Sequence, residues 1–95
     1  MKVAVRLFTT LRELAGRGEE TLEFSAKAVT VRKVLEALGK QHGKAFRDYL
    51  YDDKHMVREY LQLLVNGRSV NLMEDLETLV KEGDVLAVVP PVGGG

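Results

Sequence analysis

The chain has 95 residues, which is enough for one hydrophobic core, so we expect a single folded domain. Its 14 basic and 14 acidic residues balance and form no block of one sign, which argues against a nucleic-acid or anionic-membrane surface. The absence of cysteine excludes disulfides, thiolate metal sites and a cysteine nucleophile. The first residues form no apolar signal segment and no run approaches the ~18 apolar residues of a membrane span, so we expect a cytoplasmic protein.

Two strands and a short helix are predicted in the first quarter of the chain. Residues 2–8 alternate with a period of two, which is typical of a half-buried strand. Thr10 and Glu13 match a capping box, which predicts one or two turns of helix before Gly16. Residues 21–24 alternate again after a short link, so we expect this second strand to pair antiparallel with the first.

The main helix is predicted to start after Thr30, which is a suitable cap, and to end at Gly39 or Gly43. Its apolar residues recur at helical spacing and would pack on the sheet: Val31, Val34, Leu35 and Leu38. The following segment, 46–51, is apolar without a clear period, and 52–54 has the composition of a turn. We therefore expect irregular structure there.

A hairpin, a brief helix and a last strand are predicted in the C-terminal half. Asn66-Gly67 indicates the hairpin, because both residues tolerate the positive φ of a type I′ turn. The expected elements are a strand over 57–65, a return strand over 68–70, a helix over 75–80 and a strand over 85–89. This order favours an α+β domain in which one helix lies across a mixed sheet.

The last six residues, 90–95, are predicted to form a flexible tail outside a folded domain of residues 1–89. Pro90 and Pro91 favour an extended course, whereas the three glycines that end the chain bury nothing and cost entropy when ordered. Such a tail is either frayed filler or a slender probe. At ~3.3 Å per residue, six residues reach roughly 20 Å beyond the sheet, far enough to enter a partner's active site.

The group at the tip of such a probe is the α-carboxylate of Gly95. A carboxylate is ionised at neutral pH and is a poor electrophile until a partner activates it, which predicts an ATP-dependent activating enzyme. The resulting mixed anhydride can accept sulfur to give a thiocarboxylate, or an amine to give an amide. We therefore expect no bound cofactor and no independent catalysis, and we predict no metal, because His42 and His55 lack neighbouring ligands.

An apolar patch beside the tail is predicted from the alternation of the last strand. If Leu86 and Val88 point inward, the opposite face carries Val85, Ala87 and Val89, together with Ala4, Phe8 and Leu64. Arg6 and Arg12 would flank this patch. The alternative is that segment 46–51 covers some of these residues, which would make them core.

These features resemble the sulfur-carrier group of ubiquitin-like β-grasp proteins, which includes the small subunit of molybdopterin synthase (MoaD) and the thiamin sulfur carrier. The segments that carry the resemblance are 7–8, 10–16, 30–35, 65–67, 83–84 and 90–95. The tail is the most selective of them, because a Pro-Pro-Val stem before a C-terminal diglycine is typical of the molybdopterin-synthase branch. The resemblance implies a ubiquitin-like β-grasp fold.

The resemblance also implies a reaction cycle and its partners. A ubiquitin-activating-type enzyme would adenylate Gly95 with ATP, a sulfur donor would convert it to a thiocarboxylate, and the tail would enter the large subunit of molybdopterin synthase. The tail residues concerned are Pro90, Pro91, Val92, Gly93, Gly94 and Gly95, and the resemblance implies partner contacts at Phe8 and Val89. The apolar patch and its flank add Leu64 and Arg12 as expected partner contacts. Val89 departs from the aromatic residue often found at its position.

One feature leaves the final acceptor open. The chain carries extra length between Phe46 and Tyr60, as in a subgroup from archaea and some bacteria that includes protein modifiers and carriers for other pathways. The alternatives are therefore a sulfur carrier, a ubiquitin-like modifier joined through Gly95 to target lysines, and an interaction module whose tail is inert.

Overall fold

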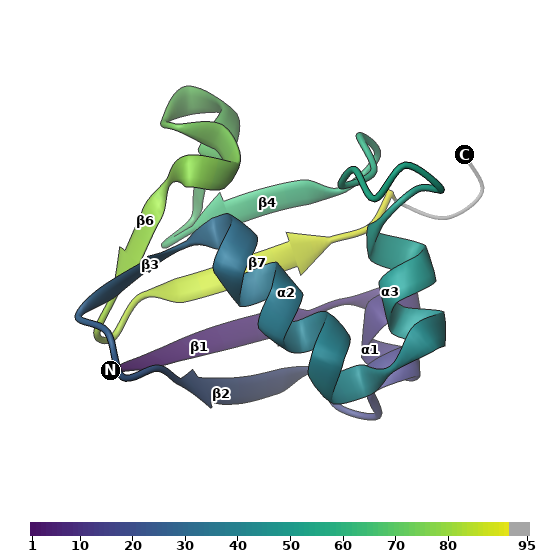
Figure 1. The fold of residues 1–95 in the computed structure, drawn as a ribbon, viewed down its shortest axis with the longest axis horizontal. Helices are drawn as coiled ribbons and strands as arrows, with labels where there is room; N and C mark the ends of the chain where they lie inside the picture. The colour runs from purple at the N-terminus through teal and green to yellow at the C-terminus, as the bar shows by residue number, and fades with distance from the viewer. Residues whose placement is uncertain (92–95) are drawn as a thin grey trace.

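The computed structural model describes residues 1–91 and is built around a five-stranded mixed sheet (Figure 1). The strand order is β2 (Glu19–Glu23), β1 (Lys2–Leu7), β7 (Val85–Val89), β4 (Gln62–Val65) and β5 (Arg68–Ser69). β1 and β7 run parallel, and the other neighbours are antiparallel. A second, two-stranded sheet joins β3 (Ala28–Thr30) to β6 (Leu79–Lys81). The predicted mixed sheet is confirmed.

Three α-helices accompany the sheet: α1 (Thr9–Ala15), α2 (Val31–His42) and α3 (Lys44–Leu50). Two short 3-10 helices, η1 (Val70–Leu72) and η2 (Asp75–Glu77), lie between β5 and β6. Figure 1 shows α2 lying across one face of the sheet, with α1 and α3 gathered at one end of it. Within residues 1–91 no helix crosses the opposite face of the sheet. None of the helices in these residues has the length and hydropathy needed to span a membrane.

The core forms between α2 and the central strands. Val3, Val5 and Leu7 of β1 are at most 1% exposed, as their alternation predicts, and they meet Leu86 and Val88 of the parallel strand β7. The four apolar residues predicted on one face of the main helix, Val31, Val34, Leu35 and Leu38, are fully buried. Burial of these side chains is the main force that holds the helix on the sheet.

The ends of α2 follow the predicted signals. The Thr30 hydroxyl accepts a hydrogen bond from the Lys33 backbone N–H at 3.1 Å, and Gly43, with φ of +92°, ends the helix. Gly39 lies inside the helix, where its lack of a side chain lets the Arg47 side chain pack against the helix backbone. A Cβ at this position would lie 2.8 Å from Cγ of Arg47, and the Arg47 guanidinium donates to the Gly39 carbonyl at 3.1 Å.

The segment after α2 differs from the prediction of irregular structure over 46–51. It is the helix α3, whose Phe46 and Leu50 are fully buried. Only one turn separates these two positions, so no period could be recognised in the sequence. The turn at 52–54 is confirmed, because Asp52 Oδ1 accepts from the backbone N–H groups of Lys54 and Met56.

Three other predictions about elements are corrected. The strand expected over 57–65 is shortened to β4, and the helix expected over 75–80 is the single 3-10 turn η2 followed by strand β6. The capping box at Thr10 does not form: α1 begins at Thr9, Phe8 is its cap residue, and no side chain caps its first turn. Phe8 is thus the single residue between β1 and α1, and the chain enters the helix directly from the sheet.

The predicted hairpin is confirmed. Asn66 and Gly67 have φ of +51° and +84° and join β4 to a return strand that stops at Ser69, because Val70 already belongs to η1. The Asn66 side chain also accepts from the Val85 backbone N–H at 2.9 Å and donates to Asp84 at 3.0 Å. The turn therefore also positions the start of β7.

Candidate functional site

The tail leaves the molecule from the strand at the centre of the sheet. β7 lies between β1 and β4, and its last residue, Val89, pairs with Gln62. Pro90 is buried against the domain, and Pro91 is exposed, with neither residue in a strand. The prediction that the chain leaves the sheet after Val89 is therefore confirmed. The tail residues Val92, Gly93, Gly94 and Gly95 lie outside the described residues.

The structure brings the predicted apolar patch together on the uncovered face of the sheet. Leu86 and Val88 are fully buried toward α2, and Val85, Ala87 and Val89 are half-buried on the other face. The strand register adds two neighbours to them: Ala4 lies opposite Val85, and Leu64 lies opposite Ala87. We call these five residues, Ala4, Leu64, Val85, Ala87 and Val89, the open-face patch.

The alternative in which segment 46–51 buries this patch is wrong. That segment is α3, which packs against α2 and α1 on the helix side of the sheet. The open-face patch thus consists of apolar side chains that the described part of the chain leaves partly accessible to solvent. An accessible apolar surface of this kind suits contact with another protein.

Phe8 lies at the same end of the sheet as the base of the tail. Leu7 of β1 pairs with Val88 of β7, so the chain leaves β1 at Phe8 where β7 approaches its end at Val89. The Phe8 side chain is 40% exposed, which is high for a phenylalanine. Its position allows one partner surface to contact both Phe8 and the base of the tail.

The two arginines expected beside the patch have local partners. Arg6 donates to Glu19 Oε2 at 3.0 Å across the β1–β2 pair. Arg12 lies in α1 with its guanidinium against Gly18, where an added Cβ would come within 3.3 Å of Nε. The structure therefore places Arg12 beside the link from α1 to β2.

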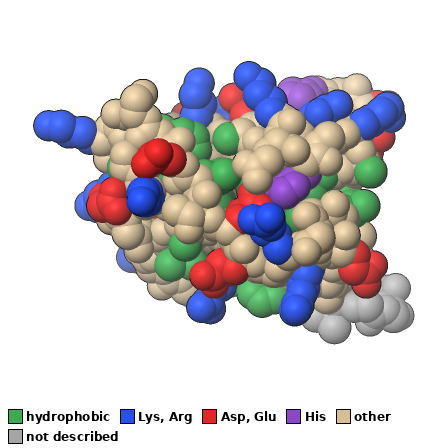
Figure 2. All heavy atoms as spheres, turned by 90° about the horizontal axis from the view of Figure 1, so that it is seen from below, with side chains coloured by type: hydrophobic (Ala, Val, Ile, Leu, Met, Phe, Trp, Pro, Cys, Tyr) green, Lys and Arg blue, Asp and Glu red, His purple; other side chains and the backbone are tan. Residues whose placement is uncertain are grey.

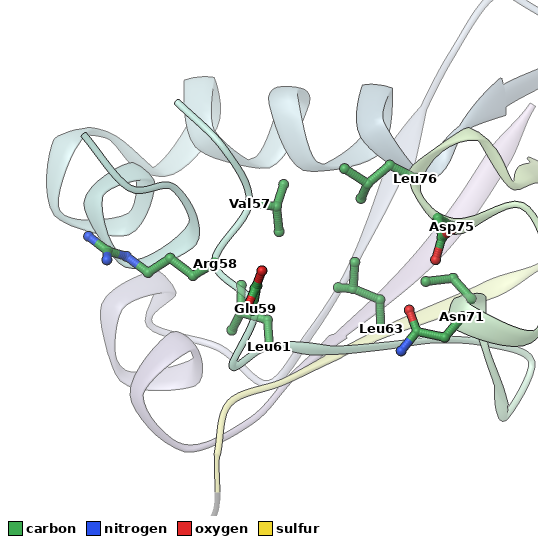
Figure 3. A pocket seen from close by; sticks show the side chains of 9 residues that line it. Val57, Arg58, Glu59, Leu61, Leu63, Asn71, Asp75 and Leu76 are labelled. Atoms are coloured by element: carbon green, nitrogen blue, oxygen red, sulfur yellow. The ribbon is translucent and has the colours of Figure 1, made fainter. Parts of the chain in front are cut away.

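A hollow that the sequence did not predict lies on the helix side of β4, and both apolar and polar side chains line it. Its volume is about 250 Å³, and its apolar walls are Val57, Leu61, Leu63 and Leu76 (Figure 3). Leu61 directly precedes Gln62, the partner of Val89, so one end of the hollow lies near the base of the tail. It was missed because residues 57–61 were assigned to a strand and instead form an irregular wall.

The titratable groups with altered pKa lie in the segment from 48 to 60. A hydrogen bond from Lys44 lowers the pKa of Asp48, and a hydrogen bond from the Met56 backbone lowers that of Asp52. Burial raises the pKa of Tyr51 and of Tyr60. These shifts come from packing of the segment after α3 and assign no acid or base to the base of the tail.

The two histidines contact one carboxylate and one aromatic ring. His42 Nε2 lies 2.9 Å from Glu20 Oε2, and the His55 ring stacks on Tyr51 with centroids 4.4 Å apart. In residues 1–91 no three His, Cys, Asp or Glu side chains gather closely enough to hold a metal ion.

Comparison with known sequences identifies relatives over the whole chain. The model of the ThiS family matches residues 5–95. A putative sulfur carrier protein from Archaeoglobus fulgidus is 36% identical over 78% of this chain and 83% of its own. Small archaeal modifier protein 3 from Haloferax volcanii is 34% identical over 100% of both chains. The molybdopterin synthase sulfur carrier subunit of Drosophila melanogaster is 30% identical over 100% of this chain and 92% of its own.

Solved structures of similar proteins have the same fold as this chain. The crystal structure of SAMP1 from Haloferax volcanii superposes with a TM-score of 0.88 at 28% identity and covers 100% of both chains. The BexX/CysO complex of Amycolatopsis orientalis contains a similar chain, with a TM-score of 0.73, 28% identity and coverage of 98% and 99%. The predicted ubiquitin-like β-grasp fold is confirmed, and the relatives include proteins that work with partner proteins. The chain therefore belongs to the ThiS family of ubiquitin-like proteins, together with sulfur carriers and small archaeal modifiers.

Proposed function

We propose that this chain is a sulfur carrier that acts in molybdopterin biosynthesis as the small subunit of molybdopterin synthase. A ubiquitin-activating-type enzyme of the cytoplasm joins the Gly95 carboxylate to AMP and releases pyrophosphate from ATP. Sulfide from a sulfur donor then displaces AMP and leaves a thiocarboxylate. The large subunit receives the tail, the sulfur passes to the pterin precursor, and water supplies the oxygen that replaces it, so that Gly95 is a carboxylate again.

The observation that carries this proposal is the position of the base of the tail, Pro90 and Pro91. It follows the central strand of the sheet directly, at the end where Phe8 is exposed and next to the open-face patch. A partner that docks on these apolar side chains would hold the rigid domain while residues 91–95 reach into its active site. Removal of the patch from water supplies the binding free energy, and the tail supplies the reacting group.

The tail composition supports the carrier role. Gly93, Gly94 and Gly95 have no side chains, so they can pass through a channel in which a Cβ would collide. The relatives named as sulfur carriers, including the subunit from Drosophila melanogaster, align over most of this chain. The same chemistry requires ATP only at the activating enzyme, and the carrier itself needs no bound cofactor.

A second candidate is a protein modifier that is joined through Gly95 to lysines of target proteins. The alignment with small archaeal modifier protein 3, which covers the whole of both chains, favours this candidate specifically. Both candidates share the acyl-adenylate and differ in the nucleophile that displaces AMP. Sulfide gives a thiocarboxylate, and a lysine ε-amine gives an amide and releases a proton.

Intact-mass measurement separates the candidates. The protein is incubated with cell extract from its host, ATP and sulfide, beside a variant lacking Gly95 and a control variant, Lys54→Ala, in the exposed turn after α3. We expect a gain equal to the replacement of oxygen by sulfur in the wild type and the control, and no gain without Gly95. Larger adducts with amide linkages would favour the modifier. An unchanged mass of the wild-type protein, in an extract that does add sulfur to a known sulfur carrier, would contradict both candidates.

A further inference from the structure

The outer edge of the sheet at β2 is unpaired in the part of the chain that the structure describes. β2 is the first strand of the sheet and pairs only with β1. At the two ends of this ladder, the Phe24 N–H donates to the Met1 carbonyl and the Leu7 N–H donates to the Gly18 carbonyl, both at 2.8 Å. In an antiparallel ladder such bonded pairs recur at every second residue.

The free backbone groups of β2 follow from this spacing. Glu20 and Leu22 form the bonded pairs with β1, so the N–H and C=O groups of Glu19, Thr21 and Glu23 point away from the sheet. An edge with alternating free donors and acceptors is a template for another strand. The edge therefore offers main-chain hydrogen bonds to an extended peptide.

A hollow of about 120 Å³ runs beside this edge, between the end of β2 and helix α2. It is lined by Phe24, Lys33, Glu36, Ala37 and Lys40. Its size is similar to that of the ~150 Å³ cavity that admits benzene in an engineered protein, so it suits one apolar side chain. In Figure 2, which views the molecule from the β2 side, Lys and Arg side chains gather along the upper rim, with hydrophobic side chains below them.

The charges around the hollow favour an acidic ligand. Lys33 and Lys40 are both exposed, and neither forms an ion pair with another described residue. Glu36 lies between them on the same helix, so the three side chains together are positive. Seven residues of helix separate the lysines by ~10.5 Å, close to the ~13 Å between residues i and i+4 of a strand.

We propose that the β2 edge binds an extended segment of a partner protein, which adds a strand antiparallel or parallel to β2. One apolar side chain of this segment enters the hollow between Phe24 and Ala37. Acidic side chains two residues before and two residues after it, which lie on the same face of the added strand, contact Lys33 and Lys40. This recognition is non-covalent and does not use the tail.

A second copy of this chain is a poorer occupant of the same edge. In an antiparallel pairing of two copies centred on Thr21, Glu19 of one copy lies opposite Glu23 of the other. Like charges directly opposite each other destabilise a strand pair. The two glutamates therefore oppose self-association while leaving the edge open to a peptide with uncharged residues on that face.

A peptide titration followed by NMR tests the proposal. The probe is the blocked peptide Thr-Glu-Thr-Val-Thr-Glu-Thr, and its matched control has Lys in place of both Glu. We expect the first peptide to shift the amide signals of Glu19, Thr21, Glu23 and Phe24, with the same shifts in a variant lacking Gly94 and Gly95. Persistence in that variant separates this proposal from the proposed function, which needs the tail.

Two sets of variants examine the two halves of the interaction. Thr21→Pro removes an outward N–H and leaves the bonds of Glu20 and Leu22 to β1, so the domain keeps its fold and loses the added strand. The double variant Lys33→Glu/Lys40→Glu is expected to bind the acidic peptide about fivefold more weakly and the Lys-containing peptide more tightly. The control variant Arg68→Glu/Lys54→Glu makes the same charge change elsewhere and should bind as the wild type does.

Several outcomes would overturn the proposal. Absence of shifts at millimolar peptide would do so, as would shifts that map to β5 or to the open-face patch. Equal binding by the double lysine variant and the wild type would also do so, and this comparison stands even if Thr21→Pro unfolds the domain. Shifts of the β2 amides that depend on protein concentration without peptide would show that a second copy occupies the edge instead.

Discussion

His42 Nε2 lies 2.9 Å from Glu20 Oε2, and this contact joins the last turn of α2 to the edge strand β2. The two side chains are 10% and 2% exposed, so each depends on the other for a polar partner away from water. Phe46 lies against the histidine ring, with centroids 4.9 Å apart, and encloses the pair further. The contact thus ties α2, α3 and β2 at one corner of the core.

Removal of one member of this pair should be costly. Glu20→Ala leaves the buried His42 without its partner, and we expect a loss of about 3 kcal/mol in the free energy of unfolding, measured by urea denaturation. Replacing both residues by leucine should cost less than the single change, because no unpaired polar group remains. The neighbouring Glu19→Ala, which breaks an ion pair with both side chains 59% exposed, is the control and should cost about 0.5 kcal/mol. Equal effects of Glu20→Ala and Glu19→Ala would contradict this account.

Tyr51→Phe should stabilise the protein. Tyr51 is 8% exposed, and its hydroxyl has no hydrogen-bond partner among the described residues. Burial raises the pKa of Tyr51, with a further increase from the Glu36 charge that Arg32 partly offsets. Loss of the unpaired hydroxyl should add about 1 kcal/mol to the free energy of unfolding at neutral pH. Tyr60→Phe is the matched change and should destabilise, because it removes a hydrogen bond of 2.9 Å to the Tyr49 carbonyl.

The same substitution predicts a change in alkaline stability. The folded protein holds the Tyr51 proton more tightly than the unfolded chain, whose tyrosines titrate near pH ~10. The stabilisation from this difference is complete below that pH and is lost as the pH rises through the raised pKa. Thermal melts between about pH 9 and 11 should therefore fall less steeply for Tyr51→Phe than for the wild type. Parallel slopes would show that Tyr51 does not titrate in this range.

Gly39→Ala should destabilise α2, although alanine normally favours a helix interior by roughly 0.5–1 kcal/mol. The new Cβ would meet Arg47 Cγ at 2.8 Å and displace the side chain that donates to the Gly39 carbonyl. We expect a loss of about 1 kcal/mol in urea denaturation. In an Arg47→Ala background the collision is absent, and Gly39→Ala should become neutral or stabilising. The same loss in both backgrounds would show that Arg47 is not the cause.

The sequence predicted the elements whose residues repeat a local pattern. Alternation revealed β1 and β2, the β-rich run before two prolines revealed β7, and the spacing of Val31, Val34, Leu35 and Leu38 revealed α2. β3 and β6 escaped prediction because each has three residues, too few for a period, and they are specified by their pairing from Val29 to Val80 across the chain. α3 escaped prediction because its two buried residues, Phe46 and Leu50, lie only one turn apart and show no period. Its place is set by the fit of Phe46 against His42 of α2.

Some features of the candidate site could also be predicted from the sequence, and others could not. The open-face patch was predictable, because the side chains of β7 that do not face the core must face the other side of the sheet. The position of Arg12 was not predictable, since its contact with Gly18 depends on how α1 turns into β2. The hollow of Figure 3 was not predictable either, because its walls come from the irregular segment 57–61, from β4 and from the 3-10 helices η1 and η2, which meet only in the folded chain.

Phe8→Asp should weaken the docking of the activating enzyme and leave the fold intact. Phe8 is 40% exposed, so its side chain contributes little to the core, whereas a carboxylate at this place would have to be desolvated in an apolar interface. We expect the dissociation constant, measured by calorimetry, to rise about tenfold and the melting temperature to change little.

Leu72→Asp provides the control for this experiment. Leu72 is 70% exposed in η1, which follows the edge strand β5, whereas Phe8 follows β1 and two strands lie between β1 and β5, so the two variants introduce the same charge on different surfaces. The control should bind the activating enzyme as the wild type does. A similar loss of affinity in both variants would point to a general charge effect and not to a contact at Phe8. A large fall in the melting temperature of Phe8→Asp would show that the side chain stabilises the core, and the docking surface would then have to lie on the open-face patch alone.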